Sequence, residues 1–155
     1  MANPFPFSSG DVLTAANLNA IGEWTAFTPT FNNVSLGASG ASAGKYAQIN
    51  DVVFWQAYFD LNSTGSISGH INMSLPVGTS PATMSYETGT IGWCQPIGSG
   101  IFNIMGYTAT NQIYFYSYYT SSVPGHAGIA QVNATAPATW NSSGRFFATG
   151  WYELA

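Results

Sequence analysis

Alternation of apolar and polar side chains is strongest over residues 45–61, where it predicts two strands joined by a tight turn at Asn50-Asp51. In the second strand one set of side chains is purely apolar and is expected to face a core. That set is Val53, Trp55, Ala57, Phe59 and Leu61. The opposite set is Val52, Phe54, Gln56, Tyr58 and Asp60. Because it carries two large aromatic residues, we expect this side to meet a second packed layer, another subunit or a ligand.

Shorter strands with the same alternation are predicted along most of the remaining chain, at residues 24–31, 34–36, 70–75, 87–94, 101–107, 112–119, 129–133 and 145–154. Within one of them, Ile71, Met73 and Leu75 are expected to point inward. The glycine- and alanine-rich residues 37–44 are predicted to be a flexible link. About eight to nine short strands with regular turn signals predict an all-β protein, an antiparallel β-sandwich or jelly roll, with a flattened barrel as the alternative.

The N-terminal residues form a separate unit in this prediction. Pro4 and Pro6 favour an extended arm, and Thr14 is a suitable N-cap for one short helix over residues 15–21. Such a short helix is marginal alone and must dock on another surface. The predicted division is an arm with a short helix at residues 1–23 and a β domain at residues 24–155.

Charged residues make up only 5% of the 155-residue chain, whereas 46% of residues are hydrophobic and 15% are aromatic. Identical copies of such a chain can pack together with little loss of side-chain entropy and little desolvation of charge. The composition therefore indicates a repeated structural part. The net charge is −4, and Lys45 and Arg145 are the only fixed cations, which argues against nucleic-acid binding.

The N-terminus lacks the basic and apolar segments of a secretion signal, and no apolar run reaches membrane-spanning length. We therefore expect no membrane insertion, synthesis in a cytoplasm and delivery by assembly. The single cysteine, Cys94, allows no disulfide within the chain and is expected to be a small buried hydrophobe.

The candidate catalytic and metal-binding residues do not have the spacing of a recognised motif. The candidates are a thiol pair of Cys94 with His70 or His126, and carboxylate or His-carboxylate sites drawn from Asp51, Asp60, Glu87 and Glu153. The whole chain has six carboxylate side chains, so a catalytic pair would be coincidental. We expect no enzyme activity, no cofactor and no bound metal.

Aromatic side chains are better candidates for a functional surface. Tyr114, Tyr116 and Tyr118 alternate onto one face of their predicted strand, with Ile113 and Phe115 on the other. Tyrosine suits both a wet subunit interface and stacking on sugar rings, and interface packing is the more common of the two uses. Together with Phe54 and Tyr58, these tyrosines are the predicted interface or glycan-binding residues.

Several short motifs lie in a characteristic order along the chain. Residues 7–21 (FSSGDVLTAANLNAI) are followed by residues 24–31 (WTAFTPTF), by Gly44 to Val52, by Ser74-Leu75-Pro76 and by residues 143–153. In their order and spacing they resemble the landmarks of bacteriophage short tail-fibre and minor tail proteins. The first two look like that family's G-x-V-L-T-A-x-x-L-N entry segment and W-x-x-Y-T-P-T-L first strand.

The resemblance implies a β-rich, homotrimeric structural protein of the virion that docks to other virion proteins through its N-terminal segment. The apolar residues expected to anchor that segment are Phe5, Phe7, Leu13, Leu18 and Ile21. As a tail appendage, the β domain would contact host-surface glycans. The alternative is a capsid decoration protein that stabilises the shell and binds no receptor. The entry segment favours the tail, and the short length without a shaft favours decoration.

Overall fold

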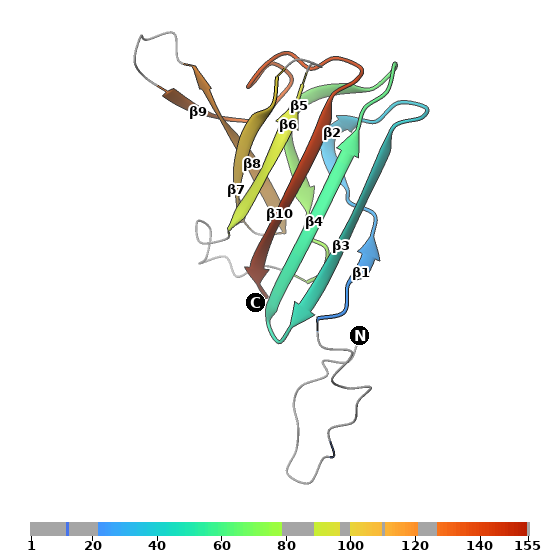
Figure 1. Cartoon of the computed structure of the whole chain (residues 1–155), viewed down its shortest axis with the longest axis vertical. Coiled ribbons are helices and arrows are strands. Elements are labelled where there is room, and N and C mark those ends of the chain that lie inside the picture. Colours follow the sequence, from blue (N-terminus) through green and yellow to red (C-terminus); the bar gives the residue numbers. More distant parts are fainter. Residues whose placement is uncertain are drawn as a thin grey trace.

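The structure is a computed structural model that describes residue 12 and residues 22–78, 89–96, 100–109, 111–120 and 127–154. All regular elements in these residues are strands, which confirms the all-β prediction (Figure 1). Their bounds are β1 Thr25–Phe27, β2 Phe31–Ser35, β3 Ala41–Ile49, β4 Val52–Asp60, β5 Ser66–Ser74, β6 Thr90–Gln95, β7 Phe102–Ala109, β8 Gln112–Thr120, β9 Ala127–Gln131 and β10 Arg145–Glu153. The predicted N-terminal helix lies outside the described residues.

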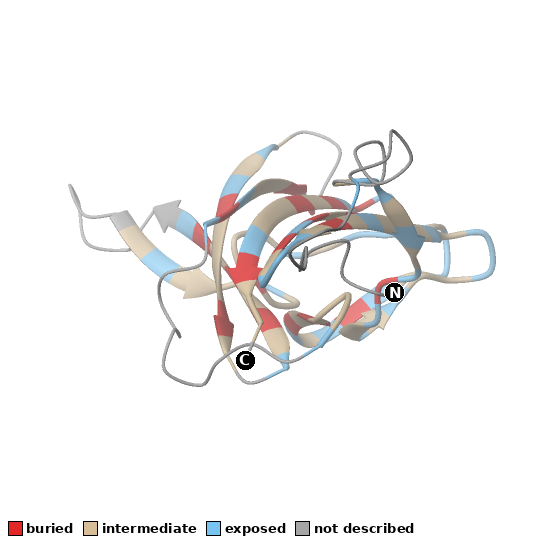
Figure 2. Cartoon of the chain, turned by 90° about the horizontal axis from the view of Figure 1, so that it is seen from below, coloured by how far each residue is buried: buried red, intermediate tan, exposed pale blue. Residues whose placement is uncertain are grey.

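The strands form one antiparallel sheet in the order β1-β3-β4-β10-β6-β7-β8-β5-β2, and β9 pairs with β8 outside this path. The sheet curls on itself, so that β2 and β5 lie across the core from β4 and β10 (Figures 1 and 2). Phe31 of β2 makes this closure visible, because its ring centroid lies 5.0 Å from Phe59 and 5.7 Å from Phe146.

The separate second sheet of the predicted sandwich or jelly roll is not observed among the described strands. The reason lies in β8, which pairs with β7 along one edge and with β5 through residues 112–114 on the other. Hydrogen bonding therefore continues from one wall to the other. The result is a half-barrel, which is closer to the flattened-barrel alternative.

The core lies inside the curl and follows the predicted alternation. The predicted inward set of β4 and of the residue after it is buried: Val53, Trp55, Ala57, Phe59 and Leu61. On the opposite wall Ile71 and Met73 are fully buried. The rings of Phe59 and Phe146 stack with centroids 5.1 Å apart, which joins the neighbouring strands β4 and β10 by an aromatic contact.

Small residues in the middle of the sheet allow two large rings to meet inside it. Across the strands, Trp55 pairs with Gly150, Thr90 pairs with Gly106, and Gly106 pairs with Phe115. The indole of Trp55 and the ring of Phe115 meet edge to face with centroids 6.4 Å apart. Trp55 and Phe115 therefore fill the space inside the sheet that Gly150 and Gly106 leave.

Two local predictions near the N-terminal end of the β domain are wrong. The predicted strand 24–31 is divided, because Thr28-Pro29-Thr30 connects β1 to β2. Residues 41–44 of the predicted flexible link belong to β3. A Cβ atom at Gly44 would lie 2.5 Å from Cε1 of Phe27, so the glycine is the site where the Phe27 ring of β1 covers β3.

Candidate functional site: an outer aromatic face

The side of the sheet that points away from the core carries large apolar residues across many strands. Strand register aligns them in rows, such as Tyr58 with Phe147, Phe147 with Trp93, and Met105 with Tyr116. We define the outer face as the outward-pointing large side chains of β4, β10, β6, β7 and β8. These are Phe54, Tyr58, Phe147, Trp151, Ile91, Trp93, Met105, Tyr107, Tyr114, Tyr116 and Tyr118.

Several members of the outer face are open to solvent. The exposed fraction is 66% for Ile91, 51% for Tyr118 and 41% for Phe54. Single exposed apolar residues are normal on protein surfaces, but aligned apolar rows across neighbouring strands are typical of an interaction surface. The outer face is therefore the candidate functional site.

The structure places the predicted interface or glycan residues on this one face. Phe54 and Tyr58 alternate outward on β4, and Tyr114, Tyr116 and Tyr118 alternate outward on β8. Along the curled sheet the two groups are separated by β10, β6 and β7, which is four strand spacings or about 19 Å measured over the sheet. The predicted anchors Phe5, Phe7, Leu13, Leu18 and Ile21 lie outside the described residues.

Sequence reasoning missed the residues that join these two groups. They are Ile91, Trp93, Met105, Tyr107, Phe147 and Trp151. Alternation in residues 145–154 contained the signal for two of them, because buried Phe146, Ala148 and Tyr152 put Phe147 and Trp151 on the other side.

Three tyrosines stack at the β7–β8 end of the outer face. The ring of Tyr107 lies 5.3 Å from that of Tyr114 and 5.6 Å from that of Tyr116, with interplanar angles of 18° and 28°. A hydrogen bond with the Tyr116 side chain, and to a lesser extent partial burial, raises the pKa of Tyr107. Next to the stack is a shallow hollow of about 340 Å³, lined by Met105, Gly106, Tyr107, Tyr116 and Ile129.

Further hollows lie across the same face. One of about 410 Å³ is lined by Ile91, Gly92, Trp93, Asn103, Ile104, Phe147 and Thr149. Another of about 370 Å³ is lined by Ala26, Ala43, Gly44, Lys45, Gln56, Ala57, Tyr58 and Phe147. Phe147 lines both hollows. Such a corrugated apolar surface suits the interdigitation of side chains from another protein surface.

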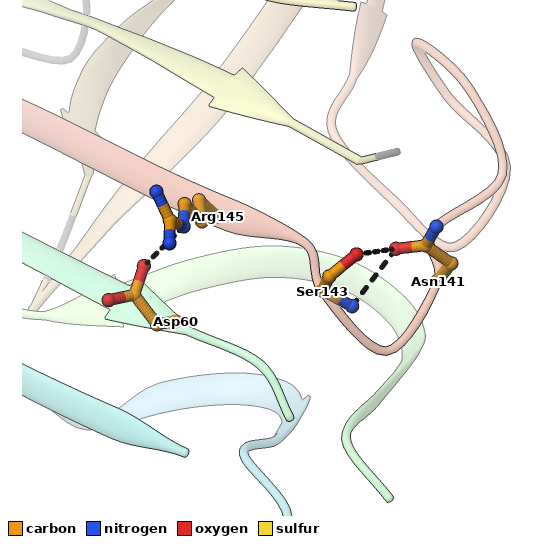
Figure 3. Close-up of polar contacts among 4 residues, drawn as sticks. All are labelled: Asp60, Asn141, Ser143 and Arg145. Atoms are coloured by element: carbon orange, nitrogen blue, oxygen red, sulfur yellow. Dashed lines mark hydrogen bonds and ion pairs between the residues drawn. The ribbon is translucent and has the colours of Figure 1, made fainter. Parts of the chain in front are cut away.

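Charged groups are confined to the ends of the strands that carry the outer face. Arg145 Nε lies 3.6 Å from Asp60 Oδ1, and both side chains are about half exposed (Figure 3). Beyond β4, Lys45 Nζ lies 4.8 Å from the ring centroid of Trp24. The middle of the outer face is uncharged, so covering it would require no desolvation of an ion.

Asparagines in the loops at residues 62–64, 133–135 and 141–143 act as local structural caps. Asn141 Oδ1 accepts hydrogen bonds from the Ser143 backbone N–H at 3.0 Å and from the Ser143 hydroxyl at 2.9 Å (Figure 3). Asn62 and Asn133 make the same pattern with the threonine two residues later. These Asn-X-Ser/Thr triplets are Asx turns, which explains their recurrence in loops.

The candidate catalytic residues do not form a site within the described part of the chain. Cys94 is fully buried, and burial raises the pKa of its thiol to about 12, so the prediction of a small buried hydrophobe is confirmed. His70 is exposed on β5, whereas His126 and Glu87 lie outside the described residues. Among the residues described, no group of three or more His, Cys, Asp or Glu side chains could hold a metal ion. The absence of enzyme activity stays a prediction.

Searches against known proteins give one informative likeness, and it concerns the fold. No family model and no curated protein matches the chain. The crystal structure of the Dettilon tailspike protein (gp208) is similar, with a TM-score of 0.56 and 18% sequence identity. The fold resembles part of a tailspike. The match covers 86% of this chain but only 24% of the tailspike chain. Separately, the described residues contain no helix long and apolar enough to cross a membrane.

Proposed function

We propose that this chain is a structural protein of a bacteriophage virion, a subunit of a tail appendage whose outer face is its assembly surface. One observation carries the proposal. Large apolar side chains lie in rows on the outward side of β4, β10, β6, β7 and β8, with uncharged polar residues such as Gln56 and Thr149 between them, while the other side of the same strands already encloses the core. Folding of one copy does not require a second apolar side, whereas copies that assemble can bury that side in their interface.

Two further observations support a tail appendage. The fold resembles part of a tailspike protein. The motifs at residues 7–21 and 24–31 resemble the entry segment and first strand of short tail-fibre proteins. In this proposal the chain is a homotrimer, and residues 1–23 attach it to other virion proteins. The side chains that would make that attachment are Phe5, Phe7, Leu13, Leu18 and Ile21.

A matched pair of variants tests the assembly. Phe54 and Trp151 are directly opposite each other on β4 and β10, and both are exposed. The double variant Phe54→Ser, Trp151→Ser should keep its fold and sediment as a monomer at concentrations where the unmodified protein is an oligomer. His70→Ser, which removes an exposed ring from the opposite wall, should keep the oligomer. A monomeric unmodified protein would refute the assembly surface.

Labelling of the chain in purified particles tests the location. Signal at the tail in a few copies supports the appendage. Signal over the whole shell would replace it with the capsid decoration role, in which the outer face binds neighbouring shell subunits.

Binding of host-surface glycans is the second candidate function, and the tyrosine stack favours it. Tyr107, Tyr114 and Tyr116 present parallel rings beside a hollow of about 340 Å³. Flat aromatic surfaces with hydroxyl tips are suited to stacking on sugar rings. Glycan-array binding that is lost in Tyr116→Ala, with the oligomer unchanged, would support this role; binding to no glycan by the unmodified oligomer would refute it.

A further inference from the structure

The strands β8 and β9 continue as a two-stranded ribbon beyond the rest of the sheet. Pairing of β8 with β5 involves residues 112–114, and pairing with β7 ends at Ser117. From Tyr118 to Thr120, the only strand neighbour of β8 among the described residues is β9, through Ala127 to Ile129. Figure 1 shows this end of β8 and β9 extending away from the curled body. We call residues 118–120 and 127–129 the ribbon.

The ribbon exposes an apolar pair. Tyr118 and Ile129 are directly opposite each other, and their exposed fractions are 51% and 55%. A two-stranded hairpin is at best marginally stable in water unless another layer covers one face. A protein surface packed over Tyr118 and Ile129 would provide that stabilisation.

One edge of β9 has no strand neighbour in the part of the chain that the structure describes. Its sequence, AGIAQ, has no charged residue and no proline, which are the usual means of preventing contact at an exposed edge. Within the described residues, β9 pairs only with β8. Both the side chains and the edge of the ribbon are thus suited to contact with another protein.

The hollow lined by Ile91, Trp93 and Phe147 is a suitable receiving surface. It lies on β6, β7 and β10, has a volume of about 410 Å³ and is lined by no charged side chain. The ribbon cannot reach it within one copy, because both are parts of the outward side of the same sheet. A second copy can bring its ribbon there, and neither surface would bury a charge in doing so.

We propose that the ribbon of one copy packs against this hollow of the next copy, so that the subunits associate head to tail. This inference rests on the proposed assembly function and names one contact of the outer face, in addition to the row of Phe54 and Trp151. Each copy then covers one hollow and has its own hollow covered, whereas a two-fold contact between two ribbons would leave the hollows exposed. A repeated head-to-tail contact closes into a ring when the rotation between copies permits it.

Two single variants, each disabling one side of the contact, test the inference. Ile129→Arg places a charge on the ribbon and Ile91→Arg places one beside the hollow; both residues are mostly exposed, so the monomer should still fold. Each variant should raise the dissociation constant of the oligomer by about ten-fold or more. Circular dichroism and the thermal midpoint of unfolding would show that each variant is folded. His70→Ser is the control, because it changes an exposed residue outside the contact. Tyr118→Ser is a milder variant of the ribbon.

Mixing the two variants distinguishes a ribbon-to-hollow contact from a two-fold contact between two ribbons. The Ile91→Arg copy has an intact ribbon and the Ile129→Arg copy has an intact hollow, so an equimolar mixture should form a dimer with one intact contact. Native mass spectrometry would detect that dimer, while each variant alone stays monomeric. A mixture that stays monomeric, or ribbon variants with the unmodified oligomer size, would overturn this inference and leave the proposed assembly intact. A monomeric unmodified protein would overturn both.

Discussion

Burial of Cys94 determines its chemistry. The side chain lies in the core between β10 and β7, opposite Phe146 and Phe102. Burial raises the pKa of the thiol to about 12. A thiolate, which is the reactive form, is therefore scarce at ordinary pH, and reagents cannot reach the sulfur without opening of the core.

We predict that the native protein is almost inert to Ellman's reagent. With a pKa of about 12, only about one thiol in ten thousand is ionised at about pH 8. The rate of colour formation should therefore follow unfolding, and the full signal should appear at once in guanidinium chloride, which is the control. Rapid reaction of the folded protein would show that Cys94 is accessible.

Gly92 occupies a position where the neighbouring backbone leaves no room for a side chain. A Cβ atom there would overlap the carbonyl oxygen of Phe147 and lie 2.8 Å from the Cα of Ala148. We predict that Gly92→Ala lowers the free energy of unfolding by about 1–3 kcal/mol, since strands β6 and β10 must separate to admit the methyl group. Thermal and urea unfolding would measure the loss.

Gly69→Ala is the matched control for Gly92→Ala. Its Cβ would meet the exposed side chain of Asn33 at 3.1 Å, and a small shift of that side chain, whose amide donates a hydrogen bond to the His70 carbonyl, would make room. The control should therefore be close to neutral. Backbone entropy alone would favour alanine in both variants, because glycine is the more flexible residue in the unfolded chain. Equal losses in the two variants would therefore mean that the contact with β10 does not explain the effect of Gly92→Ala.

At the scale of elements, alternation in the sequence predicted which side chains each strand turns inward. Val53, Trp55 and Phe59 are buried, and Phe54 and Tyr58 are exposed, because the direction of a side chain in a strand depends only on local backbone geometry. The extent of β3 was not predictable in this way. Small residues at positions 41–44 resemble a linker until the ring of Phe27, which covers Gly44, is known.

The candidate site depended on strand order, which is not local information. Tyr58 and Tyr116 were both predicted as surface aromatics, but they belong to one surface only because β10 lies between β4 and β6. That insertion brings Phe147 and Trp151 from the end of the chain beside β4. Periodicity within a segment assigns a residue to a face, whereas the partner of each strand follows from packing of the whole chain.

We predict that β1 is held to the sheet by the contact between Phe27 and Gly44. In Gly44→Val the Cβ would lie 2.5 Å from Phe27 Cε1, so the ring must move and β1 should loosen. Hydrogen exchange of the amides of Thr25–Phe27 should become faster, while that of β4 should change little. The control is Ala43→Val, because Ala43 pairs with Tyr58 on the outer side. Unchanged protection of β1 in Gly44→Val would contradict this account.

The whole molecule is one curled sheet with two apolar sides, an inner side and an outer side. The inner side closes on itself through contacts such as Phe31 with Phe59, so folding of one copy satisfies it. Side chains on the outer side of one copy cannot close over one another in this way, because the sheet curls with that side facing away from the core. An apolar outer side of this kind is typical of a surface that another molecule covers.

The distribution of charge predicts how assembly responds to salt. Among the described residues, three charged ones lie close to the outer face: Arg145 and Asp60 pair with each other at 3.6 Å at strand ends, and Lys45 lies on β3 over the ring of Trp24. Association through the uncharged middle should therefore depend little on screening.

We predict that the dissociation constant of the oligomer changes by less than about three-fold between about 0.05 M and 0.5 M NaCl, a range over which the screening length falls several-fold. Sedimentation equilibrium at several salt concentrations would measure it, with Arg145→Gln as the control that removes the rim ion pair. A ten-fold weakening at high salt, abolished in Arg145→Gln, would show that the rim charges and not the aromatic rows hold the copies together.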